Sequence, residues 1–239
     1  MRVALFIPCF VDQFFPESAM NMVKILEKSG CNVSYNPNQT CCGQPAFNAG
    51  FWDEAHEVAV KFLEDFKQQE YIVAPSASCT GFIRNYYPKL FENRAHASGA
   101  QAIGKHVYEF TEFLTEVLNL EDLGSVWNGK VTYHDSCAAL RECKIKEGPR
   151  KLLKNVKGLE LIEMESTDSC CGFGGTFSVK YGDISAAMAD QKINHALNTG
   201  AQAILSTDLS CLMQLQGVIQ KKGISIQTLH IADVLSGGM

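Results

Sequence analysis

The stretch RVALFIPC at residues 2–9 is an apolar run that ends in a proline and a cysteine. Short apolar runs of about 4–8 residues bounded by turn residues are typical of strands buried on both faces of a parallel sheet. The stretch KVTYHDSC at residues 130–137 has the same form and again ends in a cysteine. We therefore predict two buried strands, each with a cysteine just beyond its C-terminal end.

The cysteines repeat along the chain. The triplet Cys-Cys-Gly occurs at residues 41–43 and again at residues 170–172, and matching cysteines precede and follow it at similar distances. Eight of the 10 cysteines thus form two sets of four, offset by about 130 residues: Cys9, Cys41, Cys42 and Cys79, then Cys137, Cys170, Cys171 and Cys211. Chance adjacency does not account for two such pairs with matching flanks, so we infer an internal duplication.

Strand-like and helix-like segments alternate around these cysteines. Further strands are expected over residues 32–35, 71–74, 159–164, 203–206 and 224–229, and helices over residues 17–29, 51–67, 149–156 and 183–198. Such alternation predicts an α/β protein with parallel strands and right-handed crossovers. We expect two pseudo-repeated lobes, residues 1–122 and 123–239, packed closely because no low-complexity linker separates them.

Composition and charge exclude several classes of protein. The chain has 239 residues, of which 46% are hydrophobic and 20% charged, so it has enough apolar side chains to build a core. Its formal charge of −5 argues against a nucleic-acid-binding protein, which normally has a basic face. No stretch approaches the ~20 apolar residues of a membrane span, and the first apolar run lacks the features of a signal peptide. We therefore expect a cytoplasmic protein, in a compartment where structural disulfides are unlikely to persist.

The two cysteine sets predict metal centres. The cysteines follow strand ends, and open α/β sheets bind ligands beyond the C-terminal ends of their strands. Soft thiolates select iron–sulfur clusters or zinc. Both members of a vicinal pair can serve one site only if the backbone turns there, and Gly43 and Gly172 supply that freedom.

Three alternatives compete with an iron–sulfur interpretation. Zinc usually takes short Cys-x2–4-Cys knuckles, which neither set contains. A vicinal disulfide or thiol switch would have to occur identically twice. The glycine-rich loop at residues 172–175 resembles a phosphate loop only loosely, because it lacks both established nucleotide-binding spacings. The vicinal pairs and long separations therefore favour iron–sulfur clusters.

Four other residues bear on the two sites or lie outside them. His134 and Arg141 lie near Cys137 and are candidates for contacts with a cluster sulfur or with a substrate carboxylate. The alternatives are a hydrogen-bonded histidine at a strand end and a surface arginine paired with a nearby glutamate. Cys31 and Cys143 fall outside the repeat, so we expect them to be buried packing residues.

The motifs resemble a known family. The pattern of a cysteine, then Cys-Cys-Gly, then a further cysteine resembles the cysteine-rich CCG domain, which occurs twice in the B subunit of heterodisulfide reductases and in the iron–sulfur subunit of glycolate oxidase. Across nearly its whole length the chain is similar to the lactate utilization protein A family, through VALFIPCF, CCGQPAFNAG, PSASC, YHDSCAALRE and CCGFGGTFSVKY.

This resemblance implies a role and a set of ligands. It implies an iron–sulfur electron-transfer subunit of a complex that oxidises L-lactate to pyruvate, rather than an enzyme acting alone. It also implies two partner proteins, one of them ferredoxin-like, and a small 2-hydroxy acid as substrate. The eight repeated cysteines take the role of ligands, for two [4Fe–4S] clusters. A glycolate- or disulfide-linked oxidoreductase subunit, or a metal-stabilised scaffold without redox turnover, is the alternative.

The chain departs from the fullest form of the family motif. Ser76 and Asp208 occupy the places of a fifth cysteine in the two sets. The unusual five-cysteine cluster of the reductase subunits is therefore not expected. We expect ordinary four-cysteine clusters, or clusters with one open or oxygen-ligated iron, for which Asp208 is the better candidate because a carboxylate is ionised at neutral pH.

Overall fold

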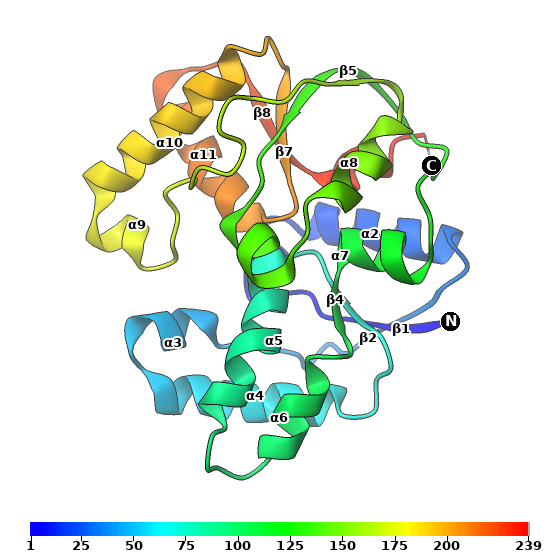
Figure 1. The fold of residues 1–239 in the computed structure, drawn as a ribbon, viewed down its shortest axis with the longest axis vertical. Coiled ribbons are helices and arrows are strands. Elements are labelled where there is room, and N and C mark those ends of the chain that lie inside the picture. Colours follow the sequence, from blue (N-terminus) through cyan, green and yellow to red (C-terminus); the bar gives the residue numbers. More distant parts are fainter. Residues whose placement is uncertain (239) are drawn as a thin grey trace.

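Two parallel sheets of identical topology organise the molecule. The computed structural model describes residues 1–238. The strands of the first sheet lie in the order β2-β1-β3-β4 and those of the second in the order β6-β5-β7-β8, and every strand pair is parallel. The strands are β1 (Arg2–Leu5), β2 (Asn32–Tyr35), β3 (Ile72–Ala74), β4 (Val107–Glu109), β5 (Val126–Tyr133), β6 (Lys157–Leu161), β7 (Ala203–Ser206) and β8 (Gln227–His230). The predicted α/β fold with two similar lobes is confirmed (Figure 1).

Helices cover both sheets. The first lobe carries α1 (Cys9–Phe14), α2 (Pro16–Lys28), α3 (Gln44–Ala49), α4 (Trp52–Phe66), α5 (Ala77–Leu90), α6 (Ala97–Ile103), α7 (Phe110–Glu112) and the π-helical turn η1 (Phe113–Val117). The second carries the π-helical turn η2 (Ala138–Cys143), α8 (Glu147–Lys154), α9 (Phe177–Lys180), α10 (Gly182–Leu197), α11 (Leu209–Lys222) and α12 (Ile231–Leu235).

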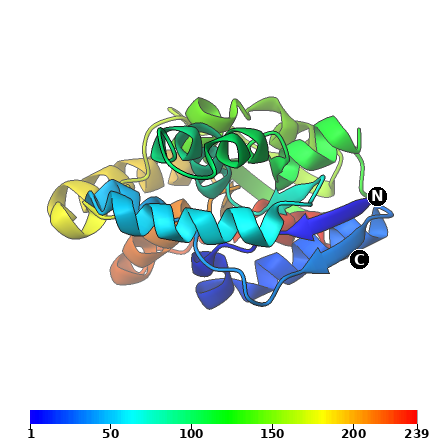
Figure 2. The same cartoon turned by 90° about the horizontal axis from the view of Figure 1, so that it is seen from below.

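Strand β1 and the residues just after it show how the first sheet is buried on both faces. Alternate side chains point to opposite faces of a strand. Val3 and Leu5 join the core that contains α2, whereas Ala4 and Phe6 join a separate core with α4, α5 and α6. In Figure 1, α2 lies above β1 and α4 below it, and in the view from below α4 lies in front (Figure 2). The apolar run at residues 2–9 is therefore a strand covered on both faces, as its composition predicts.

Several elements differ from the sequence expectation. Strand β6 begins two residues before the expected start at Leu159, and β8 runs from Gln227 to His230 instead of over residues 224–229. Hydrophobic periodicity did not reveal β4, which has only three residues and ends on a charged one, Glu109. Nor did it reveal α5 and α11, which follow directly after β3 and β7 and contain the last cysteine of each set.

Helices of each lobe pack against helices of the other lobe. The two sheets fall on either side of the expected boundary between residues 122 and 123. However, α12 of the second lobe packs on α2 of the first, and α7 of the first packs on α8 of the second. Asp233 at the start of α12 accepts hydrogen bonds from Ser18 (3.0 Å) and Asn21 (3.1 Å) of α2. One hydrophobic core therefore contains residues of both lobes.

Candidate metal centres

The first cysteine set gathers where three segments leave the sheet. Cys9 opens α1 directly after β1, Cys41 and Cys42 lie in the loop that follows β2, and Cys79 lies in the first turn of α5 after β3. The Sγ atoms of Cys42 and Cys79 are 3.4 Å apart. Cys42 is buried and Cys9 is exposed, so the set extends from the core to the surface. The topology thus brings together thiols that lie far apart in the sequence.

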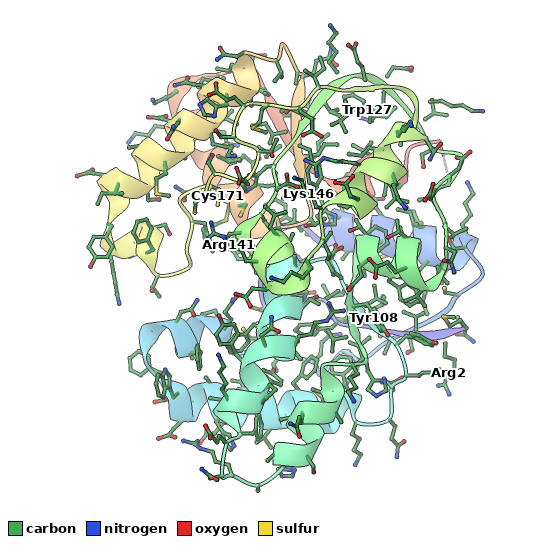
Figure 3. All side chains as sticks on the ribbon, in the orientation of Figure 1. Arg2, Tyr108, Trp127, Arg141, Lys146 and Cys171 are labelled. Carbon is green, nitrogen blue, oxygen red and sulfur yellow. The ribbon has the colours of Figure 1, made fainter. Side chains whose placement is uncertain are left out.

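The second set repeats this arrangement. Cys137 follows β5 and precedes η2, Cys170 and Cys171 lie in the loop after β6, and Cys211 lies in the first turn of α11. Cys171 and Cys211 are buried, whereas Cys137 is exposed. Figure 3 shows Cys171 in the second lobe, beside α11. All ten cysteines have free thiols, so neither vicinal pair forms a disulfide in this structure.

The glycine after each vicinal pair turns the backbone as predicted. Gly43 has a φ of +91° and Gly172 a φ of +90°, and residues other than glycine rarely adopt this backbone conformation. The turn directs backbone N–H groups at sulfur: Gly43 N–H donates to Cys41 Sγ and Gly172 N–H to Cys170 Sγ, both at 3.4 Å. Phe173 N–H donates to Cys171 Sγ at 3.5 Å. Amide donors of this kind stabilise thiolate sulfur.

Hydrogen bonds connect the thiols within each set. Hydrogen bonds from Cys42 and Cys9 lower the pKa of Cys41 to about 3. Likewise, hydrogen bonds from Cys137 and Cys171 lower the pKa of Cys170 to about 2. The same contacts raise the pKa values of the donating thiols. One thiolate per set is therefore stabilised by its neighbours, and the thiols that donate to it are held in the protonated form.

This donor set fits a soft metal centre. Four sulfurs converge in each lobe without the short knuckles of structural zinc sites, and backbone amides point at one sulfur of the first set and at two of the second. Four thiolates complete the ligation of a [4Fe–4S] cluster, which supplies one-electron redox chemistry when bound. The residues that would hold the two clusters are the eight repeated cysteines.

His134 distinguishes the second set from the first. It lies directly after β5, is buried, and brings a ring nitrogen within 4.8 Å of the sulfurs of Cys171 and Cys211. Neither ring nitrogen has a hydrogen-bond partner among the described residues. Burial lowers the pKa of His134 to about 4, so the ring is neutral at pH 7.

Ser76 and Asp208 meet each other between the lobes. They form an isolated antiparallel bridge, and Ser76 Oγ donates to Asp208 Oδ1 at 3.2 Å. Asp208 Oδ1 also accepts from the Ser78 hydroxyl (2.8 Å) and N–H (3.2 Å), and Oδ2 accepts from the Ser136 hydroxyl (2.6 Å). We call these four residues the lobe seam. Three of the four hydrogen bonds are to Oδ1 and only one is to Oδ2.

Arg141, Cys31 and Cys143 lie outside the two cysteine sets. Arg141 is exposed in η2, at the junction of the lobes, and forms no ion pair within residues 1–238 (Figure 3). Cys31 is buried in the core beneath α2, as expected of a packing residue. Cys143 is also buried, and its thiol donates to the Ala77 carbonyl at 3.4 Å.

Sequence reasoning missed three contributors to these sites. Ser78 and Ser136 belong to the lobe seam, and Lys192 lies fully buried behind the second set. Serines beside a cysteine carry no distinctive signal. Nothing beside Lys192 in the sequence marks it as buried.

Comparisons with known proteins agree with the repeat. The model of a family described as "Cysteine-rich domain" (CCG) matches residues 3–84 and 131–216. Lactate utilization protein A of Geobacillus sp. (strain WCH70) is 43% identical over 237 residues, which cover 99% of each chain. Lactate utilization protein A 1 of Bacillus mycoides (strain KBAB4) is 45% identical over 237 residues, 99% of this chain and 97% of that one.

A solved structure shares the whole fold. A hypothetical protein from Helicobacter pylori superimposes with a TM-score of 0.66 at 12% identity. The superposition covers 100% of this chain, which spans about half (49%) of the length of that one. At this identity the likeness extends to the fold alone. A search of the described helices found none with the length and apolar character needed to cross a membrane.

Proposed function

The chain belongs to the lactate utilization protein A family, and from this premise we propose that it is an iron–sulfur electron-transfer subunit of a complex that oxidises L-lactate to pyruvate. The observation that carries the proposal is the convergence of two four-cysteine sets in one chain, each with a stabilised thiolate. Such sets are suited to iron–sulfur clusters and need no catalytic side chain of their own.

The electron count of the reaction supports two centres. Oxidation of lactate to pyruvate breaks the C–H and O–H bonds at the hydroxyl-bearing carbon and releases two electrons and two protons. A pair of one-electron centres in one chain can take up both electrons. The exposed Cys9 and Cys137 place one edge of each set at the surface, where a partner can approach.

Partners complete the proposed system. We expect two partner proteins, one of them ferredoxin-like, that deliver electrons to this subunit or accept them from it. A cytoplasmic location is consistent with ten free thiols, because that compartment keeps thiols reduced.

Anaerobic purification with iron and sulfide analysis tests the proposal. We expect iron and acid-labile sulfide at both sites, with broad visible absorption that bleaches on reduction. Protein that holds zinc but no sulfide after anaerobic reconstitution would refute a redox role. Co-purification with the two partners and a substrate screen of 2-hydroxy acids would then separate lactate from glycolate.

A further inference from the structure

The duplication allows the surroundings of the two cysteine sets to be compared position by position. Phe6 and His134 each lie three residues before the first cysteine of their set. A Cβ atom added at Gly43 would meet the backbone of Ala55, and one added at Gly172 would meet that of Ser185. Phe62 and Lys192 each lie seven residues beyond these contacts. The residues Phe6 and Phe62 in the first lobe therefore correspond to His134 and Lys192 in the second.

An aromatic pair lies behind the first set. The rings of Phe6 and Phe62 pack edge to face, with centroids 4.9 Å apart, and both side chains are buried. They belong to the core cluster that also contains Cys42. The first centre therefore has buried aromatic side chains at the two positions that His134 and Lys192 occupy in the second lobe.

The corresponding pair in the second lobe is polar and cationic. Lys192 is 0% exposed, and its ammonium donates to the carbonyl oxygens of Ser166 (2.6 Å) and Thr167 (3.0 Å). The Thr167 carbonyl also accepts from the Asp135 N–H at 3.1 Å, so it is already shared by two donors. His134 has no hydrogen-bond partner within residues 1–238, and one of its ring nitrogens lies within 4.8 Å of the sulfurs of Cys171 and Cys211.

Burying these two groups costs stability unless something offsets the cost. Burial lowers the pKa of Lys192 to about 8, whereas the negative charge of Asp168 acts to raise it. The ammonium therefore stays mostly charged at pH 7, where the two carbonyl oxygens hold it inside the lobe. A thiolate-bound centre would use both features, the cation as a neighbouring charge and the imidazole as a donor to sulfur.

We propose that His134 and Lys192 give the second centre a higher reduction potential than the first. This inference rests on the proposed function, since it requires a redox centre at both sites. Net charge near a cluster and hydrogen bonds to its sulfurs are the main protein-controlled determinants of its potential. A buried cation favours the reduced, more negative state, and an N–H donor to sulfur does the same.

Redox titration of the reconstituted full-length chain, followed by electron paramagnetic resonance, tests this inference. We expect two midpoint potentials in the wild type, assigned by their loss in Cys42→Ser and Cys171→Ser. His134→Phe restores the residue of the first lobe, and Lys192→Gln keeps a donor but removes the charge. Each substitution is expected to lower the midpoint potential of the second centre by about 59 mV, which is a tenfold change in the equilibrium constant for transfer of one electron. Lys192→Arg keeps the charge and should keep the potential.

Phe62→Leu is the matched control, because it changes the equivalent position of the first lobe without adding or removing charge. It should leave the second potential at its wild-type value. Two clusters of equal potential, or variants that shift both potentials alike, would overturn the inference while leaving the proposed function intact. A wild-type protein that binds no iron and sulfide would instead refute the proposed function itself.

Discussion

Gly172→Ala is expected to destabilise the protein more than the glycine-to-alanine substitutions at Gly43 and Gly217. At Gly172 the backbone has a φ of +90°, and an added Cβ would lie 2.4 Å from the carbonyl oxygen of Ser185. The left-handed conformation costs a residue with a Cβ about 1–2 kcal/mol. Displacing packed backbone adds about 1–3 kcal/mol. We therefore expect the free energy of unfolding to fall by about 2–5 kcal/mol.

Two matched glycine-to-alanine substitutions serve as controls for this change in stability. At Gly43 the φ is the same within a degree, but the added Cβ would lie 3.1 Å from the Ala55 carbonyl oxygen. Gly43→Ala should therefore cost mainly the conformational part, about 1–2 kcal/mol. Gly217 is exposed within α11 and has nothing within 4 Å of an added Cβ. Gly217→Ala should raise stability by about 0.5–1 kcal/mol, because alanine is the better helix former.

Urea unfolding of the metal-free, reduced protein measures these differences, and iron content measures their effect on the sites. Gly172→Ala should also lose iron from the second site before the first, since it displaces the N–H that donates to Cys170 Sγ. Equal destabilisation by Gly172→Ala and Gly43→Ala would show that the close approach to Ser185 contributes nothing. The reasoning from backbone contact would then be wrong.

Three further predictions concern other parts of the molecule. Cys42→Ser and Cys171→Ser should each abolish one cluster, whereas Cys31→Ser should keep both, as counted by iron and sulfide per chain. Burial raises the pKa of Glu109 to about 8 from 4.5, so the native state binds the extra proton and the free energy of unfolding should fall as the pH rises through this window. Glu109→Gln should remove that fall in urea titrations at several pH values, and an unchanged slope would contradict the assignment. Asp208→Ala should cost about 2–4 kcal/mol in the same assay, because buried hydroxyl donors lose their acceptor; a cost below about 0.5 kcal/mol, typical of a surface site, would exclude a role in joining the lobes.

The fold could be predicted because its signals are local and repeated. The apolar run before Cys9 and the triplets around Gly43 and Gly172 fix strands and turns through neighbouring residues alone. The partner of Asp208 could not be predicted, since Ser76 lies 132 positions away and a serine carries no periodic signal. The structure joins Ser76 and Asp208 to each other by a hydrogen bond, and the expectation of an oxygen ligand for iron at these positions stays a prediction.

Lys192 escaped prediction for a different reason. A lysine on an amphipathic helix is normally exposed, and nothing beside it in the sequence marks it as buried. Only the comparison between the two halves identifies its position as an interior one, because a buried phenylalanine occupies the same place in the first half. Internal duplication therefore carries information on burial that composition and periodicity lack.

The exchange of α12 and α7 between the lobes bears on the origin of the chain. Half a molecule ending near residue 122 would leave α2 without α12, and the hydroxyl of Ser18 and the amide of Asn21 would lose their acceptor, Asp233. A single-lobe protein would regain this contact as a two-fold dimer in which the last helix of each copy packs on the other copy. In a fused chain, each half can accumulate substitutions that identical subunits would have to share. A buried histidine and lysine could then arise beside one cysteine set while the other kept its phenylalanines.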